Sequence, residues 1–447
     1  MKQPPRGVSF GTIFMLAVAF VVVGLSAVTL PRLLGTANFN MDVSGAISAL
    51  TLDGALPRLN LTEIPISDAT AAPENEEDSV QDTATPTPAP TPAPTSTPIP
   101  GGTVTLTLGG SINIDDAIRK SAYYSDSGKY DFSDIMVFLR DEMRADLNFL
   151  TLENITYEDA KVSSLNAPCE VMDALAGAGV EIVALGHPKA AEKGVEGIRA
   201  TIDAAKEQGM ATLGIYANQE EAARYRLFTV DNVDVAFLHY TESVTSSGKK
   251  NLQNAGAVYA LSTIKVNGTT DAMLADIRDA KAAGADVVIV SLNWGKVSAS
   301  KPTAEQKTIA QQLADAGADA IIGAGSRVVQ PITWLASKDE NGETRHVLCA
   351  WSLGSLLNES RKDGNVFGML LQLQIYFDGQ DISFQKVCYT PTYIWRYKQD
   401  SQYYYRVVIS DQPAPDGMGE DQIGYMEKAL RNLQKYLDDS PVTLRTK

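Results

Sequence analysis

The first pattern in the chain is a continuous apolar run, from Phe10 to Leu30, that contains no charged residue. A run of this length is enough for a helix to cross a hydrocarbon core about 30 Å thick. Lys2 and Arg6 precede the run and acidic sequence follows it, which predicts a cytoplasmic N-terminus and an extracytoplasmic remainder. A cleaved signal peptide is the alternative, although its apolar region is usually shorter. We therefore expect a cytoplasmic segment over residues 1–6 and a transmembrane anchor over residues 7–31.

The next segment, residues 32–100, has no sustained hydrophobic period. Residues 33–66 contain some apolar positions, and we interpret them as a juxtamembrane region. An acidic stretch then leads into TATPTPAPTPAPTSTPIP. Its regularly spaced prolines disfavour helix and sheet and favour extended polyproline geometry. We predict that residues 32–100 form an acidic, Pro/Thr-rich linker outside the cytoplasm.

From residue 101 onward, short β-branched runs alternate with amphipathic segments, which is typical of an α/β domain. Three predicted helices end at Gly177, Gly284 and Gly317, and each is followed by an apolar run, VEIVAL, ADVVIVSL or ADAIIG. Runs that are apolar at nearly every position suit strands covered on both faces by other elements. The clearest helix spans residues 303–316, where Thr303 and Gln306 have the spacing of a capping box.

Other junctions predict antiparallel pairing. Asp231-Asn232 and Asp378-Gly379 each separate two apolar runs in the manner of a hairpin turn. We therefore predict a layered α/β sandwich, with mixed β-sheets flanked by helices, over residues 101–406. After Thr390 the pattern becomes irregular and rich in tyrosine, and residues 407–447 read as a C-terminal tail with one helix.

Composition narrows the possible functions. Asp and Glu number 54 against 38 Lys and Arg, and the resulting net charge of −16 argues against nucleic acid as a partner. The three cysteines are far apart in sequence and show no Cys-x-x-Cys spacing, so neither a zinc cluster nor a disulfide framework is indicated. Only three histidines occur, which limits any metal site that needs imidazole.

Ligands in α/β sheets bind beyond the carboxyl ends of the strands, so the blocks around those ends are the most informative. They read TLTLGGS, ADLNFLTLEN, NAPCEVMDALAGAGVEIVAL, VSLNWG, PTAEQKTIAQQLADAGADAIIG, WSLGS and YTPTYIWRY. In this order and spacing they resemble the bacterial capsule-synthesis proteins of CapA type. The resemblance runs from Thr103 to Arg406 and implies a calcineurin-like metallophosphatase fold and a role in poly-γ-glutamate capsules.

Active-looking members of that family carry Asp, Asn and His at the ends of these strands, and the resemblance implies that such groups hold divalent metals that bind phosphate and activate water. This chain departs from the pattern at most matched positions, which hold Gly110, Thr151, Pro188, Ala324, Gly325 and Ser355. We therefore expect a degenerate metal site and no cofactor. A divalent metal would be bound only if this interpretation is wrong.

Three possible donors remain at or beside the matched positions: Glu153, His187 and Asn293. A rearranged site built from them would make the chain a hydrolase of phosphate or amide bonds. The alternative interpretations are that Glu153 accepts hydrogen bonds from loop amides and that His187 is an ordinary loop residue.

Cations now occupy part of the same region. Lys189 and Arg327 stand where the family has histidine, and Lys296 follows the Trp294-Gly295 pair. Our hypothesis is that these cations bind an anion directly through charge-assisted hydrogen bonds, with Trp294 as a stacking surface. In the alternative interpretation, the cations are solvated loop residues and Trp294 packs beneath the site.

From the resemblance and its departures we predict a single-pass protein of the cell membrane whose main domain is extracytoplasmic. We expect it to be a catalytically degenerate binding or assembly component in the synthesis or export of a capsule or envelope polymer. An anionic polymer and membrane-bound capsule-synthesis proteins are the expected partners. A third class, a domain that binds a protein partner through the tyrosine-rich segment, is left open.

Overall fold

The computed structural model describes residues 101–445, apart from residues 159–160, 219–224, 256–259 and 340. The predicted cytoplasmic segment, anchor and linker all lie outside the described residues. Within the described part of the chain, no helix is both long and apolar enough to span a membrane.

The larger sheet has nine strands. Its main path is β18-β17-β16-β1-β4-β5-β6, with β15 beside β1 and β19 beside β17. Strands β1, β4, β5 and β6 are parallel, whereas β16, β17 and β18 are antiparallel to their neighbours on the main path; β15 and β19 are parallel to β1 and β17. The bounds are β1 (Gly102–Ile112), β4 (Leu147–Leu152), β5 (Ile182–Ala184), β6 (Ala211–Leu213), β15 (Ser355–Leu357), β16 (Phe367–Phe377), β17 (Ile382–Gln399), β18 (Gln402–Ile409) and β19 (Thr443–Leu444).

The second sheet has six strands in the order β13-β14-β12-β11-β9-β8. Its four central strands are parallel and its two edge strands are antiparallel. The bounds are β8 (Arg226–Val230), β9 (Val233–Thr241), β11 (Val287–Asn293), β12 (Ala320–Ala324), β13 (Ile332–Lys338) and β14 (Thr344–Ala350). Two short pairs complete the strands: β2 (Tyr123–Tyr124) with β3 (Lys129–Tyr130), and β7 (Ile215–Tyr216) with β10 (Ala260–Leu261).

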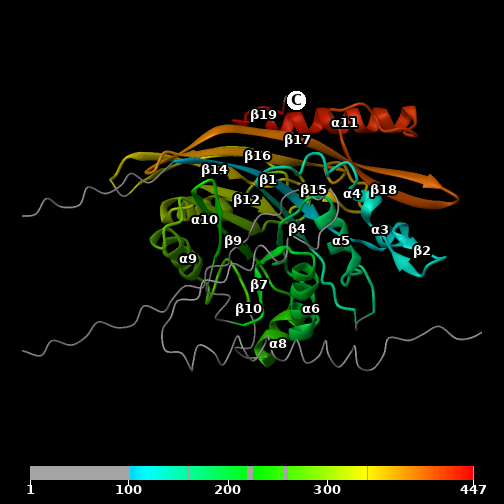
Figure 1. The fold of residues 1–447 in the computed structure, drawn as a ribbon, viewed down its shortest axis with the longest axis horizontal. Helices are drawn as coiled ribbons and strands as arrows, with labels where there is room; N and C mark the ends of the chain where they lie inside the picture. The colour runs from blue at the N-terminus through cyan, green and yellow to red at the C-terminus, as the bar shows by residue number, and fades with distance from the viewer. Residues whose placement is uncertain (1–100, 159–160, 219–224, 256–259, 340, 446–447) are drawn as a thin grey trace, which may run out of the picture. The chain divides into compact units, whose positions relative to one another are not determined.

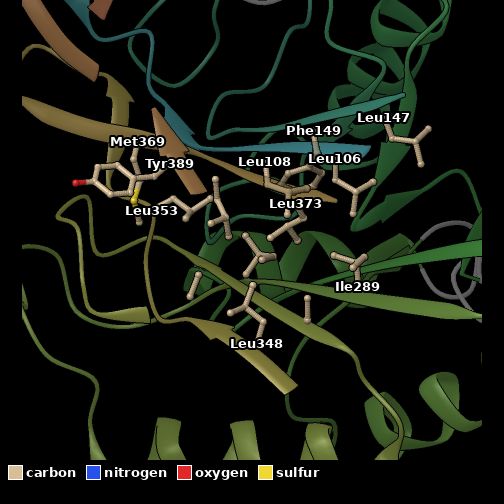
Figure 2. Close-up of a cluster of buried hydrophobic side chains, with 14 of the residues drawn as sticks. Leu106, Leu108, Leu147, Phe149, Ile289, Leu348, Leu353, Met369, Leu373 and Tyr389 are labelled. Atoms are coloured by element: carbon tan, nitrogen blue, oxygen red, sulfur yellow. The ribbon is translucent and has the colours of Figure 1, made fainter. Parts of the chain in front are cut away.

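The two sheets share one apolar core. Leu106, Leu108 and Phe149 of the larger sheet belong to the same buried cluster as Ile289 and Leu348 of the second sheet (Figure 2). Burial of these side chains is the main stabilising contribution, at roughly 25 cal/mol per Å² of apolar surface.

Helices cover the other faces of the sheets, so the predicted α/β class is confirmed (Figure 1). Residues of α5 and α6 join a cluster with the larger sheet, and residues of α9 and α10 join a cluster with the second sheet. The helices are α3 (Asp116–Ser121), α4 (Ser133–Met136), α5 (Glu170–Gly177), α6 (Gly194–Glu207), α8 (Ser246–Ala255), α9 (Asp271–Ala282), α10 (Ala304–Ala316) and α11 (Glu420–Leu437).

Local sequence signals account for several of these boundaries. The Thr303 side chain accepts from the Gln306 amide in a complete capping box, and α10 ends at Gly317 with φ 115°. Asp231 and Asn232 adopt positive φ at the predicted turn between β8 and β9.

The segment after Thr390, which the sequence pattern presents as irregular, forms a regular hairpin. Strand β17 continues to Gln399, and β18 pairs with it from Gln402 onward, with Asp400 and Ser401 in the left-handed conformation between them. Beyond residue 406, α11 packs on β16 and β17, and four of its residues are buried. The residues after 406 therefore pack against the same sheet as β16 and β17.

Candidate functional site

Glu153 lies at the centre of the candidate site, directly after β4. Its side chain is only 9% exposed. Asn293, the last residue of β11, donates from Nδ2 to Oε1 of Glu153 at 3.0 Å, and Asn113, directly after β1, donates from Nδ2 to Oε2 at 3.0 Å. The two sheets thus meet at this carboxylate, and each contributes one amide to it.

A cation completes the set of donors around Glu153. Arg327, after β12, lies 3.4 Å from Oε2 through Nη2 and is 30% exposed. A guanidinium already placed on this carboxylate opposes the approach of a divalent metal to the same oxygens, because like charges repel. Glu153 therefore has the contacts of a structural acceptor with an internal counter-cation.

Backbone atoms occupy the space that a ligand side chain would need at two of the substituted positions. A Cβ atom added at Gly110 would lie 2.2 Å from the carbonyl oxygen of Gly354. A Cβ atom at Gly325 would lie 2.9 Å from the carbonyl oxygen of Trp294, and Gly325 has φ +97°. Neither an aspartate at the first position nor a histidine at the second fits without movement of the backbone.

The other substituted positions hold side chains that do not form a metal site. Thr151, Ala324 and Ser355 are buried within strands, and Ser355 Oγ lies 3.3 Å from Ser111 Oγ. The carbonyl oxygen of Pro188 accepts from the Thr245 amide.

His187 is buried and neutral. Its Nδ1 accepts from the Lys189 amide at 3.3 Å. Burial and the Lys189 cation lower the pKa of His187 to about 3. A group with so low a pKa is a poor general base near neutral pH. None of the hydrogen bonds described for this site joins His187 to Glu153.

The three cations of the anion hypothesis are not equivalent in the structure. Lys189 is exposed, and it acts electrostatically on Asp115 and His187, as Arg327 does. Lys189 and Arg327 therefore both lie near Asp115 and His187. Lys296 is exposed, and no described interaction links it to the other two.

Trp294 is not at the surface. It is 2% exposed, its ring stacks on Trp351 at 5.9 Å, and its Nε1 donates to the Trp351 carbonyl oxygen. The ring faces are covered, so the hypothesis that Trp294 stacks on a ligand is wrong for this conformation. Packing beneath the site, the other interpretation, describes its position.

Sequence reasoning missed several residues of this region. Asn113 and Glu242 directly follow strands, and Glu242 Oε2 accepts from the Gly295 amide at 2.6 Å. Asp115 accepts from the Glu359 amide at 3.1 Å, although the two residues are far apart in sequence. Asn113 and Glu242 directly follow strands, so their positions in the sequence could have indicated that they belong to the site. No sequence pattern indicates the contact between Asp115 and Glu359.

The residues present do not fit the metal site that the fold resemblance implies. Within the described ranges, no three His, Cys, Asp or Glu side chains gather closely enough to hold a metal ion. Glu153, the carboxylate at a matched strand end, is engaged by three donors. The site therefore consists of the Glu153 carboxylate, the two asparagine amides and the Arg327 guanidinium, with the exposed cation Lys189 nearby.

Two packed mixed sheets with helices on their outer faces, and loops that converge on Glu153, define a layered α/β domain with its site at the strand ends. The family model described as bacterial capsule synthesis protein PGA_cap matches residues 105–360. That match covers more than half of the chain, which therefore belongs to this family of CapA-type capsule synthesis proteins.

Two curated relatives agree with the family. The capsule biosynthesis protein CapA of Bacillus anthracis is 26% identical over 234 residues, which are 51% of this chain and 55% of that protein. The PGA biosynthesis protein CapA of Bacillus subtilis (strain 168) is 27% identical over 144 residues, 32% of this chain and 36% of that protein. The chain thus matches about half or less of the length of these relatives.

Solved structures show weaker likeness. The NAD nucleotidase of Haemophilus influenzae has 12% identity and a TM-score of 0.38, over 77% of this chain and 57% of that one. A hypothetical protein from Thermus thermophilus has 13% identity and a TM-score of 0.34, over 65% and 98% of the two chains. Values this low carry no argument about the function of this chain.

Proposed function

We propose that this chain is a non-hydrolytic binding or assembly component in the synthesis or export of a capsule or envelope polymer of poly-γ-glutamate type. The observation that carries the proposal is the position of Arg327 on Glu153, in a site where backbone atoms fill two of the family's ligand positions. A protein with this arrangement retains the scaffold of the family and contacts an anion through cations rather than through metal ions.

The location is part of the proposal. The apolar run over residues 7–31 anchors the chain in the cell membrane, and the proline-rich linker holds the domain outside the cytoplasm. A tethered domain raises the local concentration of a bound polymer near the membrane without any turnover. Membrane-bound capsule-synthesis proteins are the partners that this location favours.

The anion-binding part of the proposal is tested with the full-length chain and purified poly-γ-glutamate. The double variant Lys189→Ala/Arg327→Ala is expected to bind the polymer at least about tenfold more weakly, because each lost charge-assisted hydrogen bond is worth roughly 1.5–3 kcal/mol before solvent screening. Lys296→Ala, an exposed cation with no described link to the other two, is the matched control. Equal affinity of the double variant and the wild type, by calorimetry at fixed ionic strength, contradicts the proposal.

The alternative function, hydrolysis of phosphate or amide bonds by Glu153, His187 and Asn293, has less support in the geometry. Asn293 contacts Glu153 directly, but His187 is buried with a pKa of about 3. These three side chains do not form the paired acid and base that hydrolysis without a metal needs.

A further inference from the structure

A cleft opens beside Arg327, on the side of the site nearest β18. Its cavity volume is about 470 Å³. Strand β18 lies along α3 at this place, where Gln402 Nε2 donates to the Lys120 carbonyl oxygen at 2.8 Å (Figure 1). The cleft is lined by Asp115, Ala117, Arg327, Glu359, Ser360, Arg396, Tyr403 and Tyr405.

Two guanidinium groups and two carboxylates line the cleft, and one of the guanidiniums, Arg327, also pairs with Glu153, so the cleft has no excess of positive charge. A segment from the interior of a polyanion would gain from Arg327 and Arg396 and would be repelled by Asp115 and Glu359. A ligand that carries an ammonium group beside a carboxylate complements both kinds of group. The balance of charge therefore favours a zwitterion over a simple anion.

The charged groups are held in place before any ligand arrives. Arg396 lies over the Tyr403 ring, with its guanidinium carbon 4.5 Å from the ring centroid, and hydrogen-bonds to Tyr405. Glu359 Oε2 accepts from the Ala117 amide at 2.9 Å, and the Glu359 amide donates to Asp115. Each of these contacts reduces the entropy cost of ordering the group on binding.

We infer that this cleft binds the amino-terminal unit of a carboxylate-bearing amino-acid chain, with the ammonium on Asp115 and Glu359 and the adjacent carboxylate on Arg396 and Arg327. The inference rests on the proposed function and deepens it, because it assigns recognition of a chain end. Lys189 acts electrostatically on Asp115, and we assign the following carboxylates of the same chain to it. Tyr403, which is 46% exposed, lines the cleft from the hairpin side.

The test compares two probes on the full-length chain: a γ-linked glutamate pentamer with a free amino end and the same pentamer after N-acetylation. Calorimetry is expected to give at least about tenfold tighter binding for the free pentamer, since acetylation removes the charge that the two carboxylates recognise. Asp115→Asn and Glu359→Gln keep an acceptor for their backbone amides, and both are expected to bring the ratio of affinities close to one. Arg396→Gln weakens binding of both probes, and Lys398→Gln, on the same strand outside the cleft, leaves both unchanged.

The outcomes separate this inference from the proposed function. Equal affinity of the wild type for the two pentamers overturns recognition of the chain end and leaves polymer binding intact. Failure of both pentamers and of the long polymer to bind contradicts the proposed function and, with it, this inference. If the free pentamer binds as tightly to Glu359→Gln as to the wild type, the cleft is not where the chain end binds, and the proposed function is unaffected. Thermal unfolding midpoints equal to that of the wild type show that the variants are folded.

Discussion

Gly110→Ala is expected to lower the free energy of unfolding by about 3 kcal/mol, at the upper end of the range for overpacking in a core. The added Cβ would lie 2.2 Å from the Gly354 carbonyl oxygen and 3.1 Å from the Leu353 carbonyl oxygen. Both are backbone atoms, which cannot rotate away as a side chain would. The Gly354 oxygen also accepts from the Ser111 amide at 3.1 Å, so its displacement strains the contact between β1 and β15. Gly110→Asp is expected to cost at least as much and to restore no metal binding.

Gly424→Ala is the matched control for this loss. Gly424 lies in the exposed face of α11 with nothing within 4 Å of its added Cβ. Alanine there is expected to raise the free energy of unfolding by about 0.5–1 kcal/mol, because glycine is the poorer helix former. Denaturant unfolding of the three proteins gives the comparison. A Gly110→Ala variant as stable as the wild type would mean that the strand has room for a side chain at this position, which the structure excludes.

Glu153→Leu is expected to lower the free energy of unfolding by about 3 kcal/mol, since two buried amide donors lose their acceptor. Asn113 and Asn293 are 2% and 4% exposed, so water does not easily replace the carboxylate. Arg327 contributes less to the loss because it is 30% exposed and can be solvated. Denaturant unfolding measures the change.

Glu242→Leu provides the comparison on a neighbouring strand end. Glu242 is exposed and accepts one bond, from the Gly295 amide at 2.6 Å. We expect its replacement to cost about 1 kcal/mol or less. The double variant Asn113→Leu/Glu153→Leu is expected to cost less than the sum of its parts, because a donor and its acceptor are removed together. Additive losses would mean that Asn113 and Glu153 are not coupled.

Where the fold was predictable, the signals were local. The capping box of Thr303 and Gln306, the glycine that ends α10 and the left-handed turn at Asp231-Asn232 each depend on residues a few positions apart. The hairpin of β17 and β18 was missed because its turn, Asp400-Ser401, carries no glycine or proline.

The sequence predicted several residues of the candidate site, but it did not predict which of them contact one another. Glu153, Asn293 and Arg327 follow from the strand ends together with the family resemblance, and the structure brings all three together. The ion pair itself joins residues 174 positions apart, and no local pattern reports such a contact. The orientation of the Trp294 ring could not be predicted either. Its position after a strand does not show whether the ring faces solvent or, as the structure has it, Trp351.

We propose that Arg327 and the backbone atoms around Gly110 and Gly325 take up the place that metal ions would need at this site. Measuring the metal content of the protein tests this proposal most directly. The full-length chain is incubated with Mn²⁺ and Zn²⁺, separated from free ions and analysed by mass spectrometry for bound metal, with hydrolysis of a phosphodiester measured on the same sample. We expect less than stoichiometric metal and no turnover above that of buffer. Stoichiometric metal, with turnover that Glu153→Ala abolishes, would contradict the proposal.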